Sequence, residues 1–223
     1  MITFPGPASA LVTLPVAPDR DGIARVLSLE RFAQENLSEV RATIPAFNRL
    51  LVEGTPGRWD PAEITSRLEA GTRAALGDAP KTAKTETVSL PVCYDLDLAP
   101  DLEQVAAEAG LGAREVARLH SATTYLVLAT GFAPGFAYLG DVDARIATPR
   151  RPSPRARVPT GAVGIADRRT GVYPTEGPGG WRLVGRVPPA LFEDAAVRIA
   201  RFTPGGPVEF RPIGRKDYEA ECG

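Results

Sequence analysis

The fold is decided between residues 131 and 189, which read GFAPGFAYLGDVDARIATPRRPSPRARVPTGAVGIADRRTGVYPTEGPGGWRLVGRVPP. This stretch holds ten of the chain's 22 glycines and nine of its 22 prolines, residues that interrupt helices and occupy tight turns. Short apolar segments lie between them, at 163–166, 171–173 and 181–184. The pattern predicts short strands joined by turns, as in a small barrel or sandwich.

The sequence around this stretch extends the same unit. Upstream, apolar spacing predicts a strand at 88–94, helices at 100–109 and 113–120, and a strand at 125–129. Downstream, 196–202 and 208–213 have the composition of closing strands. We therefore expect one β-rich domain over residues 86–223.

The first 85 residues predict a separate small α/β domain. Candidate strands occupy 8–16, 40–44 and 47–52. A helix is expected over 21–35, and a second one begins at the Asp60-Pro61 pair and ends at Gly77. The polar segment 81–87 is the expected linker, which gives an α+β chain with domains 1–85 and 86–223.

Composition excludes several functional classes. A formal net charge of −1 gives no global positive field for nucleic acid or anionic lipid. No apolar run has the length of a bilayer crossing, and the proline-broken start does not resemble a signal peptide. With only Cys93 and Cys222 as cysteines, we expect a cytoplasmic protein without disulfides.

Familiar catalytic motifs are missing from the sequence. It contains no phosphate-binding P-loop, no dinucleotide-binding glycine motif and no serine nucleophile elbow. One histidine and two cysteines are too few for a metal site built on those residues, so no metal is expected. If ATP takes part in the reaction, its site and most of the chemistry are expected on a partner.

The segment GFAPGFAYLG, residues 131–140, is the first candidate site. Glycines such as Gly135 let the backbone bend sharply or approach a ligand. The aromatic residues Phe132, Phe136 and Tyr138 offer flat apolar walls. The alternative is a tight turn whose aromatic rings enter the core.

The segment PRRPSPRARVP, residues 149–159, is the second candidate. Its prolines hold it extended, so arginines spaced by two can point to one side and bind carboxylate or phosphate. Arg150, Arg155 and Arg157 are the candidate anion-binding residues. The alternatives are a solvated basic loop or a docking surface for an acidic partner.

The segment TGVYPTEGPGGW, residues 170–181, is the third candidate. Glu176 lies among glycines near Tyr173 and Trp181, where it could orient a polar ligand or act as a base. Equally, it could form a salt bridge with an arginine of the second segment. Tyr173 and Glu176 are candidate catalytic residues, and Trp181 is a candidate wall of the site.

His120, the only histidine, lies at the end of a predicted helix. A cation is favoured there by the helix dipole, and imidazole is a common general base. We include it among the candidate catalytic residues, beside the alternative of a structural role.

Several stretches resemble one family when they are taken together. They are LPVCY (90–94), PDLEQVA (100–106), LHS (119–121), GFAPGFAYLG (131–140), PRRPSPRARVPTGAVGIA (149–166) and TGVYPTEGPGGWRLVGR (170–186). In this order and spacing they resemble the family of KipI, the B subunit of 5-oxoprolinase and allophanate hydrolase subunit 1. The resemblance is close from Ser89 to Ile213 and loose before that.

The resemblance implies a cyclophilin-like β-barrel after the N-terminal domain. It also implies membership of a 5-oxoprolinase complex, which converts 5-oxoproline to glutamate with ATP hydrolysis, and inactivity of this chain without its partners. The implied partners are the A and C subunits of that enzyme, and the latter is similar to allophanate hydrolase subunit 2. Alternatives within the family are an inhibitor of a sensor histidine kinase and a subunit of urea carboxylase or allophanate hydrolase.

Overall fold

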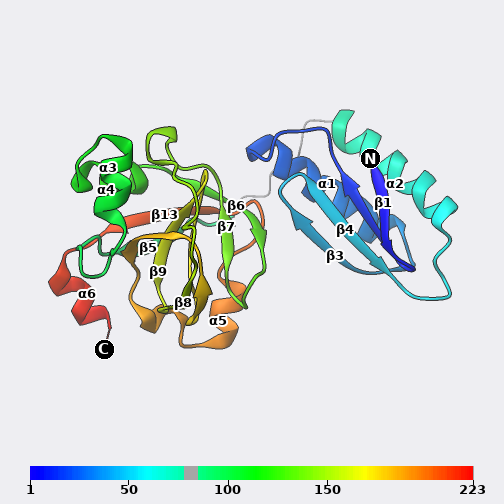
Figure 1. Cartoon of the computed structure of the whole chain (residues 1–223). Helices are drawn as coiled ribbons and strands as arrows, with labels where there is room; N and C mark the ends of the chain where they lie inside the picture. The colour runs from blue at the N-terminus through cyan, green and yellow to red at the C-terminus, as the bar shows by residue number, and fades with distance from the viewer. Residues whose placement is uncertain (78–84, 223) are drawn as a thin grey trace. The chain divides into compact units, whose positions relative to one another are not determined.

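The chain forms two compact units in the computed structural model, which describes residues 1–77 and 85–222 (Figure 1). The units comprise Met1–Lys84 and Thr85–Gly223. The domain boundary predicted from sequence lies one residue from this division. Of the predicted linker 81–87, residues 81–84 fall outside the described residues.

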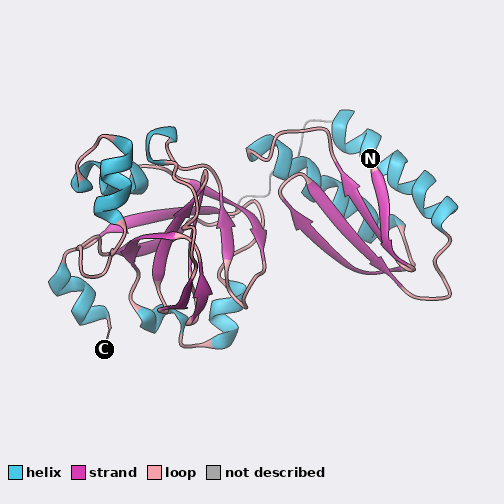
Figure 2. Ribbon diagram, viewed as in Figure 1, coloured by secondary structure: helices cyan, strands magenta, loops and turns pink. Residues whose placement is uncertain are grey.

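The N-terminal unit is a four-stranded antiparallel sheet with two helices, in the order β1-β2-β4-β3. Figure 2 shows its strands and helices by colour. The elements are β1 (Ile2–Gly6), β2 (Ser9–Thr13), α1 (Arg20–Asn36), β3 (Val40–Ala46), β4 (Arg49–Gly54) and α2 (Pro61–Gly77).

Helix α1 begins where the sequence supplies a cap and an apolar face. The Asp19 carboxylate accepts a hydrogen bond from the Gly22 N–H at 2.9 Å. Ile23, Val26 and Leu29 recur at helical spacing and are buried. This burial packs α1 against the sheet, as the periodicity predicts.

The C-terminal unit begins with β5 and contains short strands and helices. They are β5 (Val88–Val92), α3 (Leu102–Ala109), α4 (Ala113–Ser121), β6 (Tyr125–Thr130), β7 (Ala137–Leu139), β8 (Arg155–Val158), β9 (Ala162–Ala166), β10 (Arg169–Val172), β11 (Gly177–Gly179), β12 (Arg182–Arg186), α5 (Ala195–Ala200), β13 (Pro207–Pro212) and α6 (Arg215–Glu221).

The main sheet of this unit is mostly antiparallel. It runs β6-β7-β10-β9-β12, and β13 continues it by pairing with β6 and, in parallel, with β5. Its two ends meet at a single bridge, where Cys93 and Arg186 exchange hydrogen bonds of 2.9 and 2.8 Å. The combination of helices with a mostly antiparallel sheet establishes the predicted α+β class. Because the single bridge is not a continuous ladder, the predicted cyclophilin-like barrel is not confirmed.

Two hydrophobic clusters fill the C-terminal unit. The larger one centres on buried residues such as Leu90, Val127 and Phe210. The smaller one contains Phe136, Val158, Ala162, Ala166, Tyr173, Trp181 and Leu183. The second cluster joins all three of the segments that the sequence singled out, and it forms the floor of the candidate site.

The predicted closing strand at 196–202 is wrong, because Ala195–Ala200 forms helix α5. The Asp194 carboxylate accepts hydrogen bonds from the N–H groups of Ala196 and Val197, at 2.8 and 3.0 Å, and so caps the helix. Within the described ranges, no helix combines the length and apolar character that a bilayer crossing requires.

Candidate functional site

Aromatic rings from strand β7 and from the loops before β7, after β10 and before β12 enclose a small pocket in the C-terminal unit. The rings of Phe136 and Trp181 lie 5.5 Å apart and those of Phe136 and Tyr173 lie 5.6 Å apart, each pair edge to face. The cavity measures about 90 Å³ and is lined by Phe132, Phe136, Tyr138, Arg150, Tyr173, Pro178, Gly179, Gly180 and Trp181. We call it the aromatic pocket. Five residues predicted from the three separate segments meet here.

The loop between β6 and β7 forms one wall of the aromatic pocket and has an unusual backbone. Gly131, Phe132 and Gly135 have φ angles of +131°, +79° and +88°. Such a conformation costs a glycine little but strains a phenylalanine, so Phe132 is held by its surroundings. Phe132 is 63% exposed, and its ring meets Phe136 edge to face at 5.4 Å.

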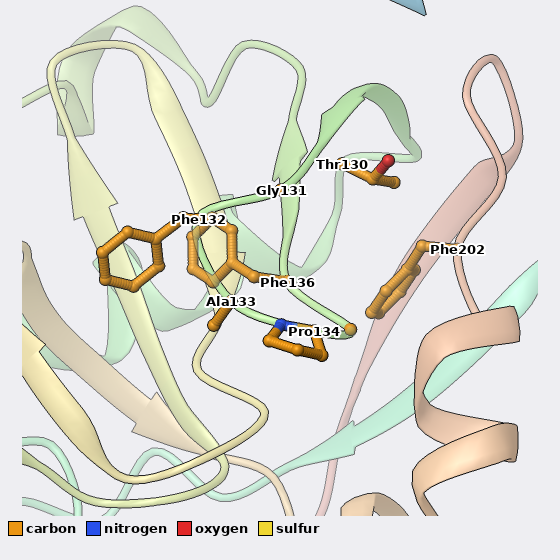
Figure 3. A pocket seen from close by; sticks show the side chains of 8 residues that line it. Thr130, Gly131, Phe132, Ala133, Pro134, Phe136 and Phe202 are labelled. Carbon is orange, nitrogen blue, oxygen red and sulfur yellow. The ribbon is translucent and has the colours of Figure 1, made fainter. Parts of the chain in front are cut away.

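A second cavity of about 380 Å³ is lined by the same loop and by Phe202. Figure 3 shows Phe202 reaching toward Pro134 from the segment that follows α5. Gly135, which the sequence placed among the ligand-binding residues, lines this cavity and not the aromatic pocket. Phe132 and Phe136 line both, so the loop forms a partition between two cavities.

Arg150 supplies the positive charge of the aromatic pocket. It is exposed, and no ion pair holds it within residues 1–77 and 85–222. A guanidinium in this state can form bidentate hydrogen bonds to a carboxylate or phosphate. Of the three predicted anion-binding arginines, this is the one that the structure leaves available beside aromatic walls.

Arg155 is already paired within the protein and is not available to a ligand, which corrects the prediction that it binds an anion. Its Nη1 and Nη2 atoms donate to the two carboxylate oxygens of Asp101 at 2.8 and 2.9 Å. Arg151 also donates to Asp101, at 3.1 Å, and the Leu183 N–H donates at 2.7 Å. Burial opposes the charged form of Asp101, yet these donors together lower its pKa below the ordinary value.

Arg157 and Glu176 form an exposed ion pair outside the aromatic pocket. The Arg157 Nε lies 2.7 Å from the Glu176 Oε1, with 77% and 46% of the side chains exposed. This confirms the alternative in which Glu176 bridges to an arginine of the basic segment. Neither residue lines the pocket, so the geometry does not support the predicted anion-binding and catalytic roles.

Tyr173 lies in the wall of the pocket, where burial raises the pKa of its hydroxyl. A hydrogen bond from the Trp181 backbone and the charges of Arg150 and Arg155 act in the opposite direction. The hydroxyl therefore stays protonated at neutral pH. In that state Tyr173 is suited to donate a hydrogen bond rather than to accept a proton as a base.

His120 is fully buried, with no exposed surface, so the structure does not support its predicted catalytic role. Its Nδ1 lies 2.7 Å from the Tyr94 hydroxyl and its Nε2 lies 2.8 Å from the Thr170 Oγ1. Burial lowers its pKa to about 3, so the imidazole is neutral at physiological pH. The helix dipole favours the protonated imidazole, but the free-energy cost of removing that cation from water is larger.

Sequence reasoning identified Tyr138 as an aromatic wall but missed Asp101 as a residue that builds the site. Tyr138 lies in a quoted motif, and its ring packs 5.0 Å from that of Phe136. Asp101 was considered only as the start of a helix, and its side chain makes no capping bond to α3. The basic segment with no acid of its own was the available signal that a buried carboxylate must lie elsewhere.

A larger groove, of about 780 Å³, lies between α4 and the segment after β5. Its walls carry both signs of charge, with Asp95 and Asp97 on one side and Arg114 and Arg118 on the other. Of the predicted site residues, none lines it. The aromatic pocket, where one cation faces apolar walls, is the more selective site for a small anion.

Comparison with known proteins identifies the family to which this chain belongs and a protein of similar sequence. The family described as the carboxyltransferase domain, subdomain C and D, matches residues 2–201. The B subunit of 5-oxoprolinase from Bacillus subtilis strain 168 is 47% identical over 133 residues. That match covers 60% of this chain and 55% of the relative, so the chain spans about half the length of that relative.

Solved structures extend the similarity over almost the whole chain. A conserved uncharacterized protein from Pyrococcus horikoshii is 36% identical and matches with a TM-score of 0.57, covering 98% of this chain and 100% of that one. The urea amidolyase of K. lactis matches with a TM-score of 0.80 at 18% identity, covering 98% of this chain and 15% of that one. The latter similarity concerns the fold alone.

Proposed function

Since the chain belongs to the family of the carboxyltransferase domain, subdomain C and D, we propose that it is one component of an ATP-dependent 5-oxoprolinase. The complex would convert 5-oxoproline, ATP and water to glutamate, ADP and phosphate in the cytoplasm. One observation carries the proposal: the predicted residues Phe132, Phe136, Arg150, Tyr173 and Trp181 meet at a single pocket.

The chemistry of the pocket suits 5-oxoproline. Its carboxylate would pair with the Arg150 guanidinium, and the apolar part of the lactam ring would contact the aromatic walls. The protonated Tyr173 hydroxyl is available to donate to the lactam carbonyl. Such a donor and a nearby cation both stabilise negative charge that develops on the lactam carbonyl oxygen.

The size of the pocket also favours the small substrate over the nucleotide. The cavity of about 90 Å³ is small beside the roughly 300–1,000 Å³ of typical ligand pockets. A compact five-membered lactam suits such a cavity better than a nucleotide with its base, sugar and phosphates. We therefore assign ATP to the complex, with most of the chemistry on partners equivalent to the A and C subunits of 5-oxoprolinase, and we propose that this chain is inactive alone.

Replacing Arg150 by alanine should impair the reconstituted complex. Loss of a hydrogen-bonded charge pair costs about 1.5–3 kcal/mol, so kcat/KM for 5-oxoproline should fall about 10- to 100-fold. The measurement is ATP-dependent glutamate release by this chain co-purified with its partners. Arg157→Ala is the matched control, because its exposed ion pair lies outside the pocket.

Two results would count against the proposal. Equal activity of the Arg150→Ala and wild-type complexes would remove the anion-binding role of the pocket. Absence of 5-oxoproline-dependent turnover in a stable complex, with turnover of urea or allophanate instead, would favour the carboxylase-type alternative.

A further inference from the structure

The segment that carries Arg150 is fixed to the rest of the unit on both sides of that residue. Before it, the Pro149 carbonyl accepts a hydrogen bond from the Arg182 Nε at 3.4 Å. After it, the Arg151 N–H donates to the Gly180 carbonyl at 2.8 Å, and Arg155 pairs with Gly179 between β8 and β11. Gly179 and Gly180 themselves line the aromatic pocket.

Asp101 is the point at which this segment is held. Its carboxylate binds the side chains of Arg151 and Arg155, the two arginines that follow Arg150 in the sequence. It also accepts the Leu183 N–H, and its own N–H donates to the Leu183 carbonyl at 3.0 Å. One buried carboxylate therefore joins the start of α3, strand β12 and the basic segment.

The side chain of Asp101 is only 3% exposed, so its charge depends on these donors. An unpaired buried charge raises the free energy of the folded state. A buried carboxylate that is paired with two arginines therefore holds both arginine side chains in place. The two arginines that follow Arg150 are thereby turned toward Asp101, while Arg150 remains at the pocket.

We infer that Asp101 is a positioning residue for the aromatic pocket: it holds the 149–157 segment so that the Arg150 guanidinium meets the ligand carboxylate. This inference rests on the proposed function for the identity of the ligand. Asp101 does not line the pocket. Its effect on binding is exerted through Arg150.

Asp101→Asn should weaken binding of 5-oxoproline about tenfold when the folded full chain is titrated. Trp181 lines the pocket, so its fluorescence reports binding, and the second tryptophan is removed by Trp59→Phe. Arg151→Ala is a milder second variant, because Arg155 still binds Asp101 when Arg151 is removed. Asp97→Asn is the control, since it breaks an exposed pair with Arg215.

A double-mutant cycle separates positioning from a general structural role. In an Arg150→Ala background, Asp101→Asn should change the dissociation constant less than twofold, because the residue it positions is absent. A full tenfold effect in that background would overturn the inference. So would a lowered unfolding midpoint with an unchanged dissociation constant.

Hydrogen exchange gives a readout that needs no ligand. Asp101→Asn should raise amide exchange across residues 149–157 about tenfold, and Asp97→Asn should leave it unchanged. Unchanged exchange in Asp101→Asn would overturn the inference whatever the ligand. If the wild-type chain and the complex both fail to bind 5-oxoproline while exchange rises, the proposed substrate fails and the anchoring role stands.

Discussion

Gly161→Ala should destabilise the C-terminal unit by about 3–5 kcal/mol, since it combines backbone strain with a steric clash. Gly161 lies between β8 and β9 with φ at +80°, where a side chain is strained. A Cβ atom there would lie 2.1 Å from the Val187 carbonyl oxygen. The clash involves backbone, so it cannot be relieved by rotating a side chain.

The hydrogen bonds around Gly161 restrict any adjustment. Its N–H donates to the Tyr173 carbonyl at 2.7 Å, and its carbonyl accepts from the Val187 N–H at 2.8 Å. Moving Val187 away would therefore break the bond that places β12 beside this turn. Because Tyr173 belongs to the aromatic pocket, the same movement would disturb the ligand site.

Gly110→Ala is the matched control for this prediction. Gly110 has a similar φ of +65° at the end of α3, but a Cβ there would meet nothing within 4 Å. Its cost should be about 1 kcal/mol from strain alone. Urea unfolding followed by Trp181 fluorescence in a Trp59→Phe background measures both variants. Equal losses would contradict the steric explanation.

The contrast between these glycines shows what sequence could and could not predict. The density of glycine and proline predicted short strands and turns from residue 131 onward, and the structure has them. Sequence could not show which glycine faces another strand's backbone, because Val187 lies 26 residues from Gly161. That depends on strand pairing, which local patterns do not encode.

The site was predictable to a similar extent. The residue types of the aromatic pocket were identified from motifs, since glycine, aromatic residues and arginine serve a small-anion site together. Which arginine is available was not predictable, because this depends on Asp101, about 50 residues upstream. Likewise, the position of His120 at a helix end gave no indication that the helix buries it.

His120 should make the protein lose stability as the pH falls from about 6.5 to 5. Its pKa is lowered to about 3 in the folded chain by burial, against about 6.5 when it is unfolded. Between these values the unfolded chain binds a proton that the folded chain does not, so the free energy of unfolding falls by about 1.4 kcal/mol per pH unit. Over this window the loss is about 2 kcal/mol.

The hydrogen bonds fix the neutral tautomer that acid must destroy. The Thr170 hydroxyl donates to the Gly164 carbonyl at 2.9 Å, so it must accept from a protonated His120 Nε2. The Nδ1 is then an acceptor for the Tyr94 hydroxyl. The rings of Tyr94, Tyr125 and Phe210 surround the imidazole, and no carboxylate among the described residues pairs with it.

Urea unfolding at pH 7, 6 and 5 tests this assignment, because His120 is the only histidine in the chain. His120→Gln should abolish the slope between pH 6.5 and 5, whatever its effect on stability at pH 7. Tyr94→Phe is the matched control: it removes one hydrogen bond but keeps the buried imidazole, so the slope should persist. The carboxylates with lowered pKa, Asp101, Glu115 and Asp143, lose their contributions only at more acidic pH, below the window that His120 governs. A slope that survives in His120→Gln would show that another group takes up the proton, and the buried neutral imidazole would then not be the source of the acid sensitivity.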